Sequence, residues 1–106
     1  MNRIPKTVYI SEAIAPNLML RGVADIFFDQ LEKVNPESYV IDFKGVESIS
    51  RSFAHQYCVR KSRSTKKFVE INMPENVVKM MNLVVSAMQN EPSRPVMYTM
   101  QEAIVV

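Results

Sequence analysis

One short segment, residues 39–57, constrains the fold of this 106-residue chain more than any other. It opens with an apolar run from Tyr39 to Ile41, which is typical of a strand covered on both faces, and Asp42 follows where that strand should end. Gly45 then marks a turn, and a helical pattern of apolar residues follows it. The segment therefore predicts a buried strand, a turn and a helix in direct succession.

Three serines, Ser48, Ser50 and Ser52, alternate with larger residues just before that helix. Serine is a preferred N-cap residue because its hydroxyl oxygen accepts a hydrogen bond from a free N–H of the first turn, and we expect Ser52 to be the cap. The free N–H groups and the helix dipole also suit this end to a phosphate or an acidic side chain. Two interpretations stay open: Ser52 only caps the helix, or one of the serines is regulated or contacts a partner.

Strands and helices alternate along the rest of the chain. Apolar periodicity predicts, in order, strand 6–10, helix 20–34, strand 39–43, helix 52–62, strand 67–72 and helix 75–88. Asn72 is the expected cap of the last helix, with Glu75 three positions on. Residues 96–106 end the chain as a strand or a short helix. This order predicts a small α/β sandwich with a mixed, largely parallel sheet and helices packed on it.

Length and composition are those of a single globular domain. The chain is 47% hydrophobic and 23% charged, and no low-complexity tract divides it, so we expect one domain over residues 1–106. The absence of a signal-like N-terminus and of an apolar stretch of about 20 residues predicts a cytoplasmic protein that does not engage the membrane. The single cysteine, Cys58, excludes an intramolecular disulfide and is expected to be a buried thiol.

Side chains for catalysis are sparse. The chain has one histidine, one cysteine and two glycines, and it lacks glycine-rich phosphate loops and the G-x-S-x-G and H-E-x-x-H motifs. Asp42 and Glu47 flank the turn and could act as acid and base or bind a metal, but two such carboxylates are a weak signal. We expect Asp42 to order the turn instead. The sequence thus predicts a protein that is not an enzyme and has no cofactor or metal site.

Basic residues gather after the serines. No acid occurs between Arg51 and Val69, and the second candidate site consists of five basic residues near the end of the predicted helix: Arg60, Lys61, Arg63, Lys66 and Lys67. They could bind nucleic acid or another anionic ligand, although the stretch lacks interleaved aromatic residues that stack on bases. A formal net charge of +2 is weak support for such a partner, and a solvated helix end is the plainer interpretation.

The run from Val40 to Ala54 resembles the strand–turn–helix signature of STAS domains, named for sulfate transporters and anti-sigma factor antagonists. Its resemblance is closer still to a STAS-like family whose pattern is an Asp-Phe-x-Gly-Val run followed by Ser-x-Ser-Phe-Ala. Both parts occur here, as Asp42-Phe43-Lys44-Gly45-Val46 and Ser50-Arg51-Ser52-Phe53-Ala54. The order of elements predicted between Lys6 and Met88 is compatible with that fold. The resemblance implies a single STAS-like domain with a regulatory role.

In anti-sigma factor antagonists, the loop before this helix carries a serine or threonine that a partner kinase phosphorylates, and this breaks the complex with the kinase. The resemblance therefore implies a protein partner, such as a kinase-like ATPase, and a phospho-switch or partner contact in the matching loop: Ser48, Ser50, Arg51 and Ser52. The family's Asp-Ser-Ser-Gly stands here as Ser50-Arg51-Ser52-Phe53. Arg51 thus occupies the place of the phosphorylated serine.

Four function classes remain, and the sequence favours a non-enzymatic regulatory module for protein–protein interaction. The methionine-rich last helix, which contains Met80, Met81 and Met88, could add to its contact surface or allow a homodimer. The alternative is nucleic-acid or anionic-ligand binding through residues 60–67, which steep salt dependence of binding would favour. The last two classes are a small enzyme that uses Asp42, Glu47 and His55, and a small-molecule sensor without catalysis.

Overall fold

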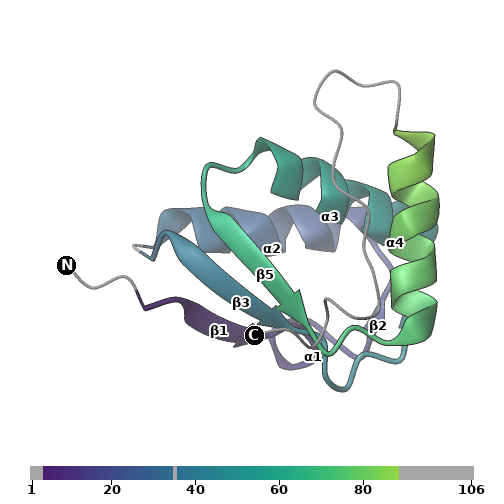
Figure 1. The fold of residues 1–106 in the computed structure, drawn as a ribbon, viewed down its shortest axis with the longest axis horizontal. Helices are drawn as coiled ribbons and strands as arrows, with labels where there is room; N and C mark the ends of the chain where they lie inside the picture. The colour runs from purple at the N-terminus through teal and green to yellow at the C-terminus, as the bar shows by residue number, and fades with distance from the viewer. Residues whose placement is uncertain (1–3, 35, 89–106) are drawn as a thin grey trace.

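Three parallel strands form the central sheet of the structure, a computed structural model that describes residues 4–34 and 36–88 (Figure 1). They are β1 (Lys6–Tyr9), β3 (Ser38–Asp42) and β5 (Lys67–Ile71), and β3 lies between the other two. Parallel neighbours need long crossover connections, and helices supply them here. The predicted α/β class with a largely parallel sheet is confirmed.

Three helices of 13 residues each pack around this sheet: α2 (Arg21–Lys33), α3 (Arg51–Arg63) and α4 (Glu75–Ala87). α2 and α3 lie side by side along the sheet, and α4 packs against α3 at the carboxyl end of the strands (Figure 1). Three shorter elements are α1 (Ile10–Ala13), β2 (Asn17–Leu18) and β4 (Ser48–Ile49). β2 and β4 pair in parallel and form a second, two-stranded sheet.

Large aromatic side chains fill the space between the sheet and the helix pair. Phe28 of α2 meets Tyr57 of α3 edge to face, with 5.2 Å between the ring centroids. Two buried tyrosine hydroxyls have hydrogen-bond partners: Tyr57 donates to Glu70 Oε2 at 2.8 Å, and Tyr39 donates to the Leu31 carbonyl oxygen at 2.9 Å. Burial raises the pKa of Tyr39. The aromatic core thus fixes α2 and α3 on the sheet without leaving these hydroxyls unpaired.

The sheet is buried unequally on its two faces. Tyr39 and Ile41 of β3 point into the core, whereas Val40 between them is half-buried and Val69, its partner on β5, is 51% exposed. Successive strand residues point to opposite faces, so this alternation places the described helices on one face. The apolar run of β3 predicts cover on both faces; within the described residues, that prediction is wrong for the face of Val40 and Val69.

The six predicted strands and helices all occur, and their ends differ from the prediction by at most one residue. Ile10, the predicted end of the first strand, instead begins α1. The sequence did not predict α1, β2 and β4, because two to four residues are too few to show a period. Residues 96–106 lie outside the described residues. Within the described ranges, no helix is long and apolar enough to cross a membrane.

Asn72 does not cap α4. The N-cap of that helix is Pro74, which has no side chain that could accept the bond, while Asn72 has a left-handed backbone with φ 56°. Asparagine tolerates this conformation better than most residues do. Its side-chain amide donates to Asp42 Oδ1 at 3.0 Å, so it joins the carboxyl ends of β5 and β3 instead of capping the helix.

Candidate functional site

The serine-bearing loop is fixed against the segment around β2. The backbone N–H of Ser50 donates to the Leu18 carbonyl oxygen at 2.8 Å, which continues the pairing of β4 with β2. The Ser48 hydroxyl donates to Asn17 Oδ1 at 2.5 Å. Residues far apart in the sequence therefore form one edge of the molecule at the start of α3.

Ser50, rather than Ser52, is the N-cap of α3. Its Oγ accepts a hydrogen bond from the Phe53 N–H at 3.0 Å and donates to the Met19 carbonyl oxygen at 2.6 Å. The prediction of Ser52 as the cap is wrong because the helix begins at Arg51, one residue earlier than expected, and only Ser50 has the extended backbone of a cap. The Ser50 hydroxyl is thus used by the fold both as donor and as acceptor.

Ser52 and Arg51 lie in the first turn of α3, and both are exposed. Among the described residues, neither the Ser52 hydroxyl nor the Arg51 guanidinium has a hydrogen-bond or ion-pair partner within bonding distance. The first turn of a helix carries free N–H groups and a partial positive charge. This position can therefore hold a phosphate or face a partner's carboxylate without breaking a contact inside the domain.

Two apolar residues, Met19 and Leu20, lie beside the serines and were not recognised from the sequence. They connect β2 to α2, and their side chains are 41% and 67% exposed. The available signal was the apolar pair directly before the helix start, of which the prediction had assigned Leu20 to the helix face. We call the surface formed by Ser48, Ser50, Arg51, Ser52, Met19 and Leu20 the serine edge.

Asp42 orders the turn, as predicted. It is the one buried charged side chain of the described residues, and its Oδ1 accepts from the Lys44 N–H at 2.9 Å as well as from Asn72. Glu47, the other carboxylate of the proposed pair, is exposed. Within residues 4–34 and 36–88, no group of three or more ligating side chains could hold a metal ion.

Three of the five basic residues of the second candidate site bind acceptor groups of this chain: Arg60, Lys61 and Lys66. The Arg60 guanidinium lies 3.0 Å from Asp25 Oδ1 and 2.8 Å from Asp29 Oδ1, and these carboxylates raise the pKa of Arg60. The Lys61 ammonium lies 2.8 Å from Glu70 Oε2. Lys66 donates to two carbonyl oxygens of the chain that follows α2, those of Val34 and Pro36. Of the five predicted anion-binding residues, Arg63 and Lys67 are exposed.

His55 belongs to a polar contact between α2 and α3. Its Nδ1 lies 3.3 Å from Nη1 of Arg21, and the same Nη1 donates to Gln56 Oε1 at 2.9 Å. Gln56 in turn donates to Asp25 Oδ1 at 2.7 Å. This bond and the contact with Arg60 lower the pKa of Asp25. His55 is half-buried beside a cation, and the structure does not bring it together with Asp42 into one site.

The remaining candidate residues face the core. Cys58 is buried, with its sulfur 3.7 Å from that of Met81, as expected for an inert thiol. Met81 and Met88 of the last helix are buried too, while Met80 is half-buried. The methionine-rich face of α4 is thus mainly part of the core, and Leu83, 49% exposed, is the large apolar residue that α4 presents outward.

Comparison of the chain with models of protein families, with curated proteins and with solved structures finds no match.

Proposed function

We propose that this chain is a non-enzymatic regulatory module that binds another protein through the serine edge, in the manner of the anti-sigma factor antagonists that it resembles in sequence. The observation that carries the proposal is the position of Ser52. Its side chain is exposed in the first turn of α3, next to Arg51, and Ser50, the cap of the same helix, bonds to Met19 of the exposed apolar pair Met19 and Leu20. A surface that is regulated by modification needs a hydroxyl of this kind, which can be modified without loss of a contact that stabilises the fold.

The three serines differ in what a phosphate would do. On Ser50, a phosphate would remove the hydroxyl hydrogen that bonds to Met19 and would crowd the cap of α3. On Ser48, it would break the bond to Asn17. On Ser52, it would add about −1.5 to −2 charges at a helix N-terminus beside Arg51, which stabilises the phosphate locally. Ser52 is therefore the phosphorylation site that we propose.

The side chains of the serine edge indicate which kind of partner surface would be complementary to it. Met19 and Leu20 offer an adaptable apolar anchor, and Arg51 offers an exposed cation, so a surface with an apolar hollow and a neighbouring carboxylate is complementary. A phosphate on Ser52 would neutralise Arg51 and repel that carboxylate. By resemblance, the partner would be a kinase-like ATPase. Phosphorylation would then release the partner and leave the module folded.

The experiment is affinity capture from lysate of the cells that make this protein, followed by identification of the bound proteins and mapping of phosphate on Ser48, Ser50 and Ser52. Leu20→Asp and Ser52→Asp should abolish capture of one and the same protein. Leu83→Asp and Ser86→Asp are the matched controls, because both residues are exposed on α4 and are not part of the serine edge; these variants should retain capture.

Two outcomes would contradict the proposal. Equal capture by all four variants would mean that the serine edge is not the contact surface. Retention of nucleic acid instead of a protein, with steep salt dependence, would transfer the function to the basic stretch around Arg63 and Lys67.

A further inference from the structure

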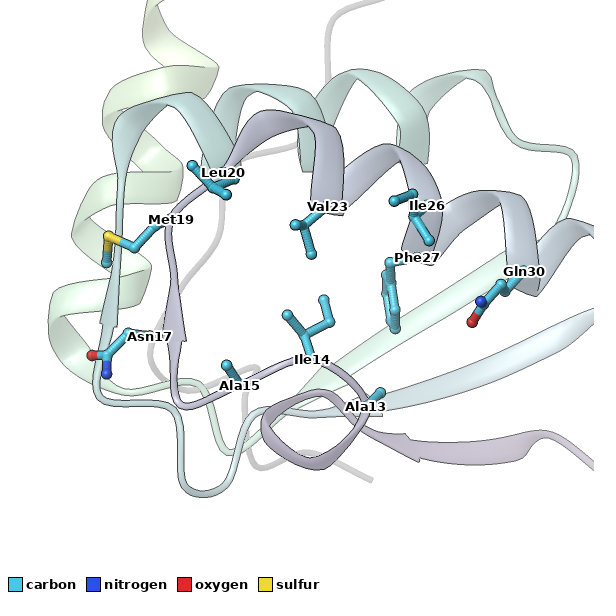
Figure 2. A pocket seen from close by; sticks show the side chains of 10 residues that line it. All are labelled: Ala13, Ile14, Ala15, Asn17, Met19, Leu20, Val23, Ile26, Phe27 and Gln30. Atoms are coloured by element: carbon cyan, nitrogen blue, oxygen red, sulfur yellow. The ribbon is translucent and has the colours of Figure 1, made fainter.

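A cavity of about 450 Å³ lies between α2 and the segment that leads from α1 to it (Figure 2). Its walls come from Val23, Ile26 and Phe27 on α2 and from Ile14 and Met19 on the facing segment. None of the ten residues that line it carries a charge. Pockets for small molecules typically measure about 300–1,000 Å³ and are mostly apolar, so the size and lining both fit such a site.

α2 has apolar residues on the side that borders the cavity as well as on the side that packs against the sheet and α3. Ala24, Phe28 and Leu31 are buried against the sheet and α3. A second row, Val23, Ile26 and Phe27, follows helical spacing along the side of the helix that borders the cavity, where Ile26 is 58% exposed. A solvent-facing side of a helix is normally polar. Phe27 is buried in the core and Val23 packs against it, so Ile26 is the residue of this row that packing of the core does not account for.

Two amide side chains are the polar groups of the cavity lining, Asn17 at one end and Gln30 at the other (Figure 2). An amide offers both a donor and an acceptor, so it can bind a hydroxyl or a carbonyl group at the end of an apolar chain. A charged head group would find no counter-ion among the lining residues. The arrangement suits an elongated molecule with an apolar body and a neutral polar end.

We propose that this cavity binds a neutral aliphatic molecule of medium length that ends in a hydroxyl or carbonyl group. The site does not depend on the regulatory function proposed above. It does share Met19 and Leu20 with the serine edge. In addition, Asn17 accepts a hydrogen bond from Ser48, and the Met19 carbonyl oxygen accepts one from Ser50. A ligand at the Asn17 end therefore contacts the two residues that hold the serine-bearing loop.

The test is a titration of the isotope-labelled full chain with 1-decanol, followed by nuclear magnetic resonance of the backbone amides. We expect saturable shifts centred on residues 13–30, and tighter binding of 1-decanol than of decanoate. Linear shifts without saturation, shifts spread over the whole surface, or equal binding of decanoate would overturn the proposal.

A matched pair of variants tests the location. Ala13→Phe fills the cavity, and Ala87→Phe adds the same ring at the end of α4; both alanines are exposed and each is the last residue of its helix. Displacing roughly two methylene groups of the ligand should weaken binding of 1-decanol to Ala13→Phe about tenfold, and Ala87→Phe should bind as the wild type does. Equal affinities of the two variants would place the ligand elsewhere.

A second pair covers the case in which Ala13→Phe does not fold. Ile26→Lys puts an ammonium group at the mouth of the cavity. The control, Leu83→Lys, puts the same group at a similarly exposed apolar position on α4, outside the cavity lining. Binding of 1-decanol should weaken with Ile26→Lys alone. An unchanged affinity of Ile26→Lys would overturn the assignment of the cavity.

Discussion

The Ser50 hydroxyl donates to the Met19 carbonyl oxygen at 2.6 Å, and the same oxygen atom of Ser50 caps α3. One side chain thereby fixes the start of α3 and the approach of the segment between β2 and α2. Because Ser50 is occupied in this way, Ser52 is the one of the three serines whose hydroxyl has no partner among residues 4–34 and 36–88 and is open to modification. The division of roles between these two serines is the basis of the regulatory proposal.

The first prediction separates a structural from a modifiable serine. Ser50→Ala removes the cap and the bond to Met19, and it should lower the free energy of unfolding by about 1–2 kcal/mol. Ser52→Ala removes no contact within the described residues and should change it by less than about 0.5 kcal/mol. Urea denaturation of both variants checks this, and equal losses would contradict the assignment of the cap.

The second prediction concerns Asn72 and its bond to Asp42. Asn72→Gly keeps the left-handed backbone but loses the side-chain bond, and should cost about 1 kcal/mol of unfolding free energy. Asn72→Ala loses the same bond and adds backbone strain, so it should cost about 1–2 kcal/mol more. Chemical denaturation gives both values. A smaller loss for alanine than for glycine would contradict the positive φ at this position.

The third prediction contrasts the two glycines of the chain. Gly45 has φ +88°, and a Cβ there would lie 2.9 Å from Ser11 Oγ, so Gly45→Ala should destabilise the protein by about 1–2 kcal/mol or more. A Cβ at Gly22, in α2, would have no atom within 4 Å. Gly22→Ala should therefore stabilise the protein by about 0.5 kcal/mol. Thermal unfolding of both variants measures the two opposite shifts.

The fourth prediction concerns stability in acid. The hydrogen bonds from Gln56 and Arg60 lower the pKa of Asp25 from its ordinary value of 3.8. A group with a lowered pKa in the folded state contributes stability above its unfolded pKa and loses it as the pH falls through the folded pKa. Gln56→Leu should therefore raise the pKa of Asp25 towards 3.8 and weaken the pH dependence of stability below about pH 4.

Carbon-detected nuclear magnetic resonance of the Asp25 carboxyl group measures this pKa directly, and unfolding free energies measured from pH 6 down to acid show the linked loss of stability. The Asp25 side chain is 39% exposed, so solvent reduces the size of the effect. An unchanged Asp25 pKa in Gln56→Leu would contradict the role of that bond.

Patterns that extend over whole elements were predictable. The apolar periods of α2, α4 and the three main strands located each element to within one residue, and the role of Asp42 followed from its place between a strand and a turn. These features depend on neighbours in the sequence, so the sequence shows them directly.

Features that depend on distant residues were not predictable. Ser50 is the cap of α3 because hydrogen bonds to Met19 and Leu18, about thirty positions away, hold it in place. Asn72 does not cap α4 and instead donates to Asp42 on another strand. In the sequence, Arg60 and Lys61 were candidates for anion binding. In the structure they form ion pairs with carboxylates of this chain, those of Asp25, Asp29 and Glu70. A sequence shows the charges but not their partners.

The most direct test of the central claim is the affinity of the captured partner for the wild-type chain, Ser52→Asp and Ser86→Asp, measured by isothermal titration calorimetry. The account predicts that Ser52→Asp binds at least about tenfold more weakly, because an acid beside Arg51 opposes the partner's carboxylate, while Ser86→Asp binds as the wild type does. Equal affinities of Ser52→Asp and the wild type would contradict a switch at this position and leave Ser52 as an exposed residue of the first turn.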